Sequence, residues 1–289
     1  MPPPRERHRW NAVLELAVGG QKPLAATRTG ASSRDAVPPK VLRALNDGLE
    51  ETRTLAEWLA IDQPTLLHAA LVAARLPDDA KRLRVAAEGR ADLRFTDRLK
   101  ASANDLRALV QGLRTPDATV RSFATSPSDM VRGWLAYAIG YDETLSLVDR
   151  LELSERFAAD RSMAVRECAW DALRPHLVRD LPTALDLLRD WTVHRHYGVR
   201  RCAIEATRPR GVWCKHIEEL KRDPAPGLSL LEPLRSDESL YVRRSVANWL
   251  NDASKDRADW VRQVCDRWER ESPTAETRWL VEHARRSLA

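Results

Sequence analysis

Carboxylates and tryptophans recur close together in the second half of the chain. Glu167 and Asp171 lie four residues apart in "AVRECAWDALR", with Trp170 between them, and Glu205 lies in "RCAIEATRPR". A carboxylate close to a deoxyribose can stabilise the oxocarbenium-like transition state of N-glycosidic cleavage or position the attacking water. A tryptophan near a carboxylate suits a cationic or electron-poor base through cation–π contact and stacking. The three carboxylates are therefore candidate catalytic residues. The candidate base-stacking residues are Trp170, Trp213 and Trp249.

Arginines and amides in the same stretches have the chemistry of phosphate contacts. Arginines at a repeat spacing can neutralise successive phosphates, and amides can donate to phosphate oxygens. The candidates for such contacts are Arg166, Arg200, Arg201, Arg208, Arg210, Arg243, Arg244, Asn248, Asn251 and Lys255. A second interpretation stays open for all of these groups, because arginines and carboxylates on one helix face also form structural ion pairs and tryptophans also pack between repeats.

A repeated helix must position these groups. A valine followed by an arginine occurs at Val131, Val165, Val199 and Val242, at intervals of 34, 34 and 43 residues. Repeats of this length, each with about two helices, are typical of HEAT-like solenoids. The longer last interval contains "RPRGVWCKH", which indicates an insertion between two helices.

Each of these valines lies near the start of a predicted helix whose residues fall into three columns. The valine and the residues four and eight positions later are mostly apolar, which predicts the side that faces the core. The residue after the valine is an arginine in each repeat, namely Arg132, Arg166, Arg200 and Arg243. The residues two, six and nine positions after the valine share another face. In chain order they are Gly133/Tyr137/Gly140, Glu167/Asp171/Arg174, Arg201/Glu205/Arg208 and Arg244/Asn248/Asn251. Because packed helices lie about 8–10 Å apart, we expect these faces to merge into one polar ribbon.

Composition favours helices and gives no sign of a membrane span or a metal site. Hydrophobic residues make up 43% and charged residues 31% of the 289 residues, and there are only 11 glycines. Without any run of strand-like alternation, the prediction is an all-α fold. No apolar run approaches the roughly 20 residues that cross a bilayer. The four cysteines lack CxxC spacing and His194 and His196 lack a third ligand, so we expect buried thiols, no disulfide and no metal. The formal net charge of +5 permits an acidic partner such as nucleic acid.

The first 36 residues differ from the rest. "MPPPRERHRW" is rich in proline and basic residues, and the stretch up to Pro38–Pro39 is a Gly/Ser/Thr/Pro-rich linker. We therefore predict a flexible basic arm over residues 1–36, with room for a short helix between Trp10 and Val18, and one helical domain over residues 37–289. The basic residues of the arm could add DNA affinity that does not depend on sequence.

Two long motifs resemble a known family. "EATRPRGVW" and "YVRRSVANWLNDASKD" resemble the bacterial HEAT-like DNA alkylation repair proteins of the AlkC/AlkD superfamily, and "LEETRTLAEWLAID" and "VRECAWDALRPHL" resemble an AlkC-related branch. The resemblance covers roughly residues 37–288. It implies a helical-repeat solenoid with a concave basic face that binds DNA, and excision of 3- and 7-alkylated purines without a metal or other cofactor.

The resemblance carries over only in part to the candidate site. Asn248 stands where AlkD-like members have a tryptophan, which puts an aromatic pocket of that type in doubt. "RECAWDALRPHL" keeps the Arg174–Pro175 pair of AlkC-like members but alters the spacing to the acidic residue, whereas Glu205 fits the family's "SEGTRPR" motif better. Because the chain ends in a predicted helix, we do not expect the additional C-terminal β-domain of AlkC.

Two functional hypotheses of different class follow. The first is a DNA repair enzyme, a monofunctional and cofactor-free DNA glycosylase that excises cationic N3- or N7-alkylated purines from double-stranded DNA. The alternative is a non-catalytic HEAT-repeat protein that binds damaged or branched DNA, and a third hypothesis is a protein-binding scaffold. For either DNA-dependent function we expect a cytoplasmic monomer that associates with the nucleoid and not with membranes.

Overall fold

The computed structural model describes residues 8–18, 28–211 and 214–288. Its regular structure is helical, and no strand occurs within these ranges, so the all-α prediction is confirmed for them. The chain forms two compact units, residues 1–172 and 173–289, and helix α9 runs through the boundary between them. None of the described helices is both long and apolar enough to cross a membrane.

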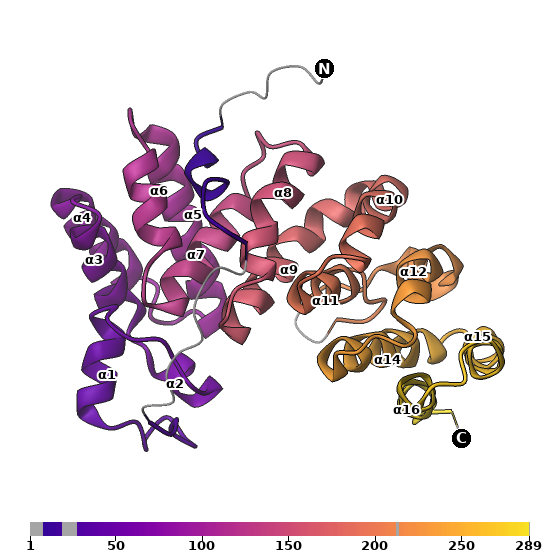
Figure 1. The fold of residues 1–289 in the computed structure, drawn as a ribbon. Coiled ribbons are helices and arrows are strands. Elements are labelled where there is room, and N and C mark those ends of the chain that lie inside the picture. Colours follow the sequence, from indigo (N-terminus) through magenta and orange to yellow (C-terminus); the bar gives the residue numbers. More distant parts are fainter. Residues whose placement is uncertain (1–7, 19–27, 212–213, 289) are drawn as a thin grey trace. The chain divides into compact units, whose positions relative to one another are not determined.

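The helices follow one another along the chain with short connections, coloured from indigo to yellow in Figure 1. The first unit contains the 3-10 turn η1 (Asn11–Val13), α1 (Pro39–Asn46), α2 (Leu55–Ala60), α3 (Gln63–Ala73), α4 (Pro77–Glu88), α5 (Phe95–Gly112), α6 (Asp117–Ala124), α7 (Asp129–Gly140), α8 (Leu147–Ala158) and most of α9 (Met163–Leu177). The second unit continues with η2 (Val178–Asp180), α10 (Leu181–Thr192), α11 (Tyr197–Ala206), α12 (Glu218–Arg222), η3 (Ala225–Gly227), α13 (Leu228–Leu231), η4 (Glu232–Leu234), α14 (Leu240–Ser254), α15 (Ala258–Glu271) and α16 (Ala275–Ala284).

The four predicted valine–arginine helices are α7, α9, α11 and α14. Their valines are at most 1% exposed, and the residues four and eight positions later are buried too. These are Leu135, Ile139, Ala169, Leu173, Ala203, Thr207, Val246 and Leu250. Burying one large aliphatic side chain contributes about 1.5–3 kcal/mol, so this column supplies much of the core of each unit. The predicted core face is confirmed.

The arginine after each valine holds the turn that precedes its helix. Its Nη1 donates to the two backbone carbonyls six and five residues earlier. The four arginines are Arg132, Arg166, Arg200 and Arg243, and the first carbonyls of the pairs belong to Ser126, Asp160, His194 and Asp237. The side chain of that first residue also accepts from the backbone N–H two residues later in all four turns. Since turn carbonyls need a partner when they are buried, this arginine is part of the architecture of the repeat.

Two aspartates join neighbouring repeats through this turn. Asp160 Oδ2 lies 2.8 Å from Nε of Arg132, and Asp237 Oδ2 lies 2.6 Å from Nε of Arg200. The backbone carbonyl of each aspartate accepts from the arginine of its own repeat. One residue therefore binds two successive arginines, one through its carboxylate and the other through its carbonyl.

The described part of the N-terminal segment packs onto the first unit. Trp10 is fully buried, and its indole Nε1 donates to Asp142 Oδ2 at 2.7 Å. Further along, Nη1 of Arg28 lies 2.5 Å from a carboxylate oxygen of Glu57, which is itself fully buried. This packing differs from the flexible arm expected for residues 1–36, because a tryptophan in a proline-rich stretch here finds a buried carboxylate. The helical turn expected near Trp10 is η1, and residues 1–7, with Arg5 and Arg7, lie outside the described ranges.

Candidate functional site

The carboxylate of Asp171 lies almost buried among three helices of the first unit. The residue is 8% exposed, and its Oδ2 accepts from Tyr137 Oη on α7 at 2.7 Å. The same Oδ2 lies 2.6 Å from Nζ of Lys100 on α5. Among the described residues no donor contacts the other oxygen, Oδ1. Asp171 thus has one oxygen fixed by the protein and one without a fixed donor.

The surroundings of this carboxylate are aromatic. Lys100 Nζ lies 5.4 Å from the centre of the Tyr137 ring, and the Tyr137 and Tyr141 ring centres are 5.4 Å apart. Burial first, and then the nearby Cys168 and Asp171, raise the pKa of Tyr137 well above its ordinary value. The phenol therefore stays protonated near neutral pH and can donate to the carboxylate throughout that range.

Glu167, one turn before Asp171 on α9, and Trp170, the residue directly before it, complete this group. The indole Nε1 of Trp170 donates to Glu167 Oε2 at 2.7 Å, and Trp170 is 5% exposed. We call the six residues Lys100, Tyr137, Tyr141, Glu167, Trp170 and Asp171 the Asp171 cluster. It combines two carboxylates, one ammonium group and three aromatic rings within one unit.

A glycine lets α7 approach α9 closely enough for the Tyr137–Asp171 bond. A Cβ added to Gly140 would lie 2.5 Å from the Cβ of Ala172 and 3.1 Å from its backbone carbonyl carbon. Backbone atoms cannot move aside cheaply, so a larger residue at Gly140 would force the two helices apart.

Glu205 lies in a separate ionic network in the second unit. It is 5% exposed, and its Oε1 accepts from Ser245 Oγ at 2.7 Å and lies 3.5 Å from Nη2 of Arg201. Its Oε2 accepts from Nη1 of Arg208 at 3.1 Å, and Nε of Arg208 donates to Asp252 at 2.8 Å. Both carboxylate oxygens of Glu205 thus have donors from α11, the following loop or α14. A buried network of this kind stabilises only while every member keeps its partner.

The two arginines beside Glu205 are tied to it structurally. Burial alone would lower the pKa of Arg208, but Glu205 and Asp252 raise it overall. The Arg201 guanidinium lies 4.3 Å from the centre of the Tyr241 ring. These two candidate phosphate contacts therefore already have partners in the protein.

Most other candidate phosphate contacts are also engaged. Arg166, Arg200 and Arg243 hold their turns, as described above. Arg210 pairs with Asp256 through two nitrogens, and Lys255 Nζ is 3.9 Å from Asp252 Oδ1. For these residues the structural interpretation has direct support in the contacts.

Of the three remaining candidates, all on α14, two contact α16 or the residues just after it and one is exposed. Asn251 is 4% exposed, and its Nδ2 donates to the carbonyl of Ala284 at 3.3 Å. Asn248 accepts from Arg286 at 2.8 Å. Arg244 is exposed and forms no ion pair with a described residue.

The three candidate stacking tryptophans differ in placement. Trp170 belongs to the Asp171 cluster. Trp249 is fully buried, donates to the carbonyl of Thr207 at 3.0 Å, and packs against Trp260. A fully buried ring has no face for a base, so Trp249 is placed as a core residue and not as a stacking one. Trp213 lies outside the described residues.

The polar ribbon predicted from the columns is therefore in part an internal contact. Within the first unit the sixth-position residues Tyr137 and Asp171 bond to each other, and within the second unit Glu205 bonds to α14. These side chains lie on neighbouring helices, as expected for the ribbon. Several of them are buried and bond to each other, so they do not form a continuous solvent-exposed face.

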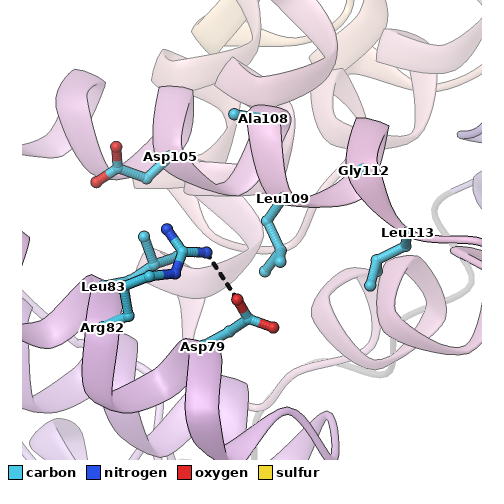
Figure 2. A pocket seen from close by; sticks show the side chains of 8 residues that line it. All are labelled: Asp79, Arg82, Leu83, Asp105, Ala108, Leu109, Gly112 and Leu113. Carbon is cyan, nitrogen blue, oxygen red and sulfur yellow. Dashed lines mark hydrogen bonds and ion pairs between the residues drawn. The ribbon is translucent and has the colours of Figure 1, made fainter.

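A hollow of about 380 Å³ lies elsewhere in the first unit, between α4 and α5. Figure 2 shows Arg82 directed to Asp79 at its edge, with Asp105 above and Leu83 and Leu109 at the wall. Asp105 is itself bound by Arg90 through two nitrogens. With these charges paired and no predicted residue in the lining, the hollow does not add to the candidate site.

None of the four cysteines forms a disulfide with a described residue, and Cys168, Cys202 and Cys265 are buried. Among the described residues no three His, Cys, Asp or Glu side chains are placed to hold a metal ion.

Lys100 and Ser245 are the contacts that sequence reasoning missed. Lys100 lies in α5, before the four repeats, and no periodicity links it to Asp171. Ser245 is three positions after its valine, which places it on the helix between the polar face and the core valine, and its helix phase alone could have indicated that it faces α11.

Comparisons with known proteins agree with this architecture. The model of a family described as "DNA alkylation repair enzyme" matches residues 135–288, more than half of the chain. The chain is 47% identical over 117 residues to an uncharacterized protein, YhaZ, of Bacillus subtilis, which covers 40% of this chain and 32% of YhaZ. It resembles the structure of Pseudomonas fluorescens alkylpurine DNA glycosylase AlkC bound to DNA with an abasic site analogue. That likeness has a TM-score of 0.68 and 29% identity, and covers 80% of this chain and 64% of AlkC. The chain thus spans less than two thirds of the length of either relative.

The helical repeats, the motifs around Glu205 and α14, and the match over residues 135–288 all lead to one assignment. This chain belongs to the DNA alkylation repair enzyme family.

Proposed function

We propose that this protein is a monofunctional DNA glycosylase that removes cationic N3- or N7-alkylated purines from double-stranded DNA, as a cytoplasmic monomer. The observation that carries the proposal is the Asp171 carboxylate, with Oδ2 held by Tyr137 and Lys100 and Oδ1 without a donor among the described residues. Family membership supports a role in DNA alkylation repair, and the likeness to an alkylpurine DNA glycosylase supports the reaction.

The chemistry requires stabilisation of charge more than proton transfer to the leaving group. An N3- or N7-alkylated purine carries a positive charge, so when the C1′–N bond breaks its electron pair neutralises the departing base. The positive charge then develops on the sugar, where the Asp171 carboxylate can stabilise it. Water adds to C1′ and releases a proton, which a carboxylate such as Glu167 can accept. The aromatic rings of the cluster suit a flat cationic base.

Asp171 is a better candidate than Glu205 on geometric grounds. A catalytic carboxylate needs an oxygen that can face the reacting atoms, and both oxygens of Glu205 already have donors from Ser245, Arg201 and Arg208. Of the three carboxylates proposed from the sequence, we therefore assign catalysis to Asp171, a supporting part to Glu167 and a structural part to Glu205.

Release of free base from methylated DNA tests the proposal. Purified protein is incubated with the DNA, and 3-methyladenine and 7-methylguanine are followed by chromatography, with wild type, Asp171→Asn and Glu167→Gln compared at equal folded concentration. We expect release by the wild type and a loss of about 100-fold or more in Asp171→Asn, the range of a removed transition-state contact. No release by the wild type, with DNA binding retained, would instead establish the non-catalytic DNA-binding protein.

A further inference from the structure

Tyr141 is the most exposed ring of the Asp171 cluster. Tyr137 and Trp170 are each 5% exposed, whereas Tyr141 is half-buried at the end of α7. Burial first, and then the charge of Asp171, raise the pKa of Tyr141 above its ordinary value, so its phenol stays neutral near pH 7. Of the three rings, Tyr141 is therefore the one that can contact a base.

A buried arginine holds the backbone on both sides of Tyr141. Arg150 on α8 is 3% exposed, and its Nη1 donates to the carbonyls of Ile139 and Gly140, the last two residues of α7. Its Nη2 donates to the carbonyl of Asp142 at 2.9 Å. The last carbonyls of a helix lack partners within the helix, and a cation beside them is favourable. Arg150 thus fixes the chain immediately before and after Tyr141.

The N-terminal segment holds the residue after Tyr141 from a second direction. Asp142 is 2% exposed, and its Oδ2 accepts from Trp10, as described above. Its Oδ1 accepts from Nε2 of Gln111 on α5 at 3.0 Å. The turn η1, which follows Trp10, packs on α6 and α8 and is drawn in indigo in Figure 1. We call Trp10, Gln111, Asp142 and Arg150 the α7 clamp.

We infer that the N-terminal segment over residues 8–18 is part of the Asp171 site. Trp10, through Asp142, and Arg150 are positioning residues for Tyr141, and Tyr141 contacts the alkylated base. The inference rests on the proposed function. It gives a part in the reaction to Trp10, which lies outside the residues 135–288 that match the family model.

The position of Tyr141 bears directly on the geometry of the cluster. The ring centres of Tyr137 and Tyr141 are 5.4 Å apart, and Tyr137 donates to the carboxylate of Asp171. A ring attracts a cation only within about 6 Å of its centre. Misplacement of a reacting or contacting group by about an ångström can lower a rate by about 100-fold. A clamp on the end of α7 therefore acts on the rate through Tyr141, without a contact of its own with the DNA.

Fluorine NMR of the full chain with ring-fluorinated tyrosine follows Tyr141 directly. The chain has four tyrosines, two in each unit, and Tyr→Phe variants assign their resonances. Spectra are compared for wild type, Trp10→Phe and Gln111→Met, because each substitution removes one donor to Asp142. Gln111→Met leaves the Trp10 ring intact, so it still tests the clamp if Trp10→Phe folds poorly. Circular dichroism and thermal melting establish that each variant is folded.

We expect both donor variants to move the Tyr141 resonance and to leave the two resonances of the second unit unchanged. Arg121→Gln is the matched control, because it removes a contact with Glu15 in the same N-terminal segment without touching the clamp. Its Tyr141 resonance should equal that of the wild type. An unchanged Tyr141 resonance in both donor variants would overturn the inference, since the ring would then keep its position without the clamp.

Single-turnover base release at saturating protein gives the second readout. Trp10→Phe and Gln111→Met should lower the rate by about 3- to 30-fold and keep the affinity for undamaged duplex DNA within about twofold, because both act through Tyr141. Tyr141→Leu removes the ring and should lower the rate at least as much. A wild-type rate for Tyr141→Leu, or a moved resonance with an unchanged rate in both donor variants, would also overturn the inference. If the wild type releases no base, the proposed reaction fails, while the Tyr141 resonance still decides on the clamp.

Discussion

Lys100 Nζ and Asp171 Oδ2 lie 2.6 Å apart, although the two residues belong to helices separated by three others in the chain. Tyr137 on α7 donates to the same oxygen. Lys100 therefore acts on Asp171 as a positioning residue, because it fixes the carboxylate without any need to contact the DNA.

Replacing Lys100 with methionine should lower the single-turnover rate of base release by about 10- to 100-fold, as expected when a transition-state electrostatic contact is misplaced by about an ångström. Lys100→Arg should recover part of the rate, because a guanidinium can still reach Oδ2. DNA affinity should change little, which separates positioning from binding. Lys81→Met on α4, where the lysine is exposed, is the control for the loss of an ammonium group. A rate for Lys100→Met equal to that of the control would exclude this role.

Glu205 should matter for stability and not for chemistry. Glu205→Ala leaves Arg208 and Arg201 without one of their buried partners, and removing one member of a buried pair costs about 3–5 kcal/mol in the free energy of unfolding. Urea unfolding measures this loss. Base release per folded molecule should stay within about threefold of wild type, which is a difference of well under 1 kcal/mol. A stable Glu205→Ala protein without activity would reverse the assignment between Glu205 and Asp171.

Asp129 should make the free energy of unfolding of the first unit depend on pH. Burial, and then the charge of Glu51, raise the pKa of Asp129 to about 6, although hydrogen bonds from Thr52 and the charge of Arg132 oppose this. Between the ordinary pKa near 3.8 and this value, the folded state binds more protons than the unfolded state. The free energy of unfolding should therefore fall by about 3 kcal/mol as pH rises from about 4 to 6, and stay level above that.

Asp129→Asn isolates this contribution. Oδ1 of Asp129 accepts from the backbone N–H groups of Thr52 and Met130, and Oδ2 accepts from the hydroxyls of Thr52 and Ser162. An asparagine can keep the first pair, and the two hydroxyls can rotate to accept from its Nδ2. We expect the variant to be more stable than wild type at pH 7.5 and equal to it near pH 4, as measured by urea unfolding at each pH. A wild-type-minus-variant difference that does not change with pH would contradict the raised pKa.

The Trp10–Asp142 hydrogen bond should anchor the N-terminal segment. Burial raises the pKa of Asp142, but hydrogen bonds from Trp10, Thr144 and Gln111 outweigh it, so the pKa is lowered overall. Trp10→Phe removes one of these donors and should cost about 1–3 kcal/mol at pH 7. Because a lowered folded pKa stabilises above the unfolded pKa and the effect is lost as pH falls through the folded value, the difference from wild type should shrink in acid.

Trp134→Phe is the matched control for this experiment. Trp134 is equally buried, but its Nε1 has no partner among the described residues. The two variants lose the same ring volume, and only Trp10→Phe loses a hydrogen bond. Equal losses at pH 7 would show that ring packing, and not the bond to Asp142, anchors the segment.

The sequence was sufficient for the repeated valine–arginine helices and their core face, because both depend on helix periodicity. For Trp249, the same periodicity predicts a place in the core and not a base-stacking position. It lies seven residues after Val242, and seven residues at about 100° each return the helix to within about 20° of the valine face, so the core was the correct location.

Other features depended on contacts that periodicity does not encode. Lys100 reaches Asp171 from outside the repeats, and Trp10 reaches Asp142 from a segment without helical pattern. The role of Nη1 of the repeated arginine could have been derived only from the turn before it, since the partners of this nitrogen are backbone carbonyls and leave no trace in residue identity.

The shared aspartates Asp160 and Asp237 make neighbouring repeats energetically dependent. When the turn that contains one of them opens, the arginine of its own helix loses a carbonyl and the arginine of the previous repeat loses a buried carboxylate partner. Opening a single turn therefore weakens two successive repeats. This coupling makes unfolding within each unit more cooperative than contacts between nearest neighbours alone would.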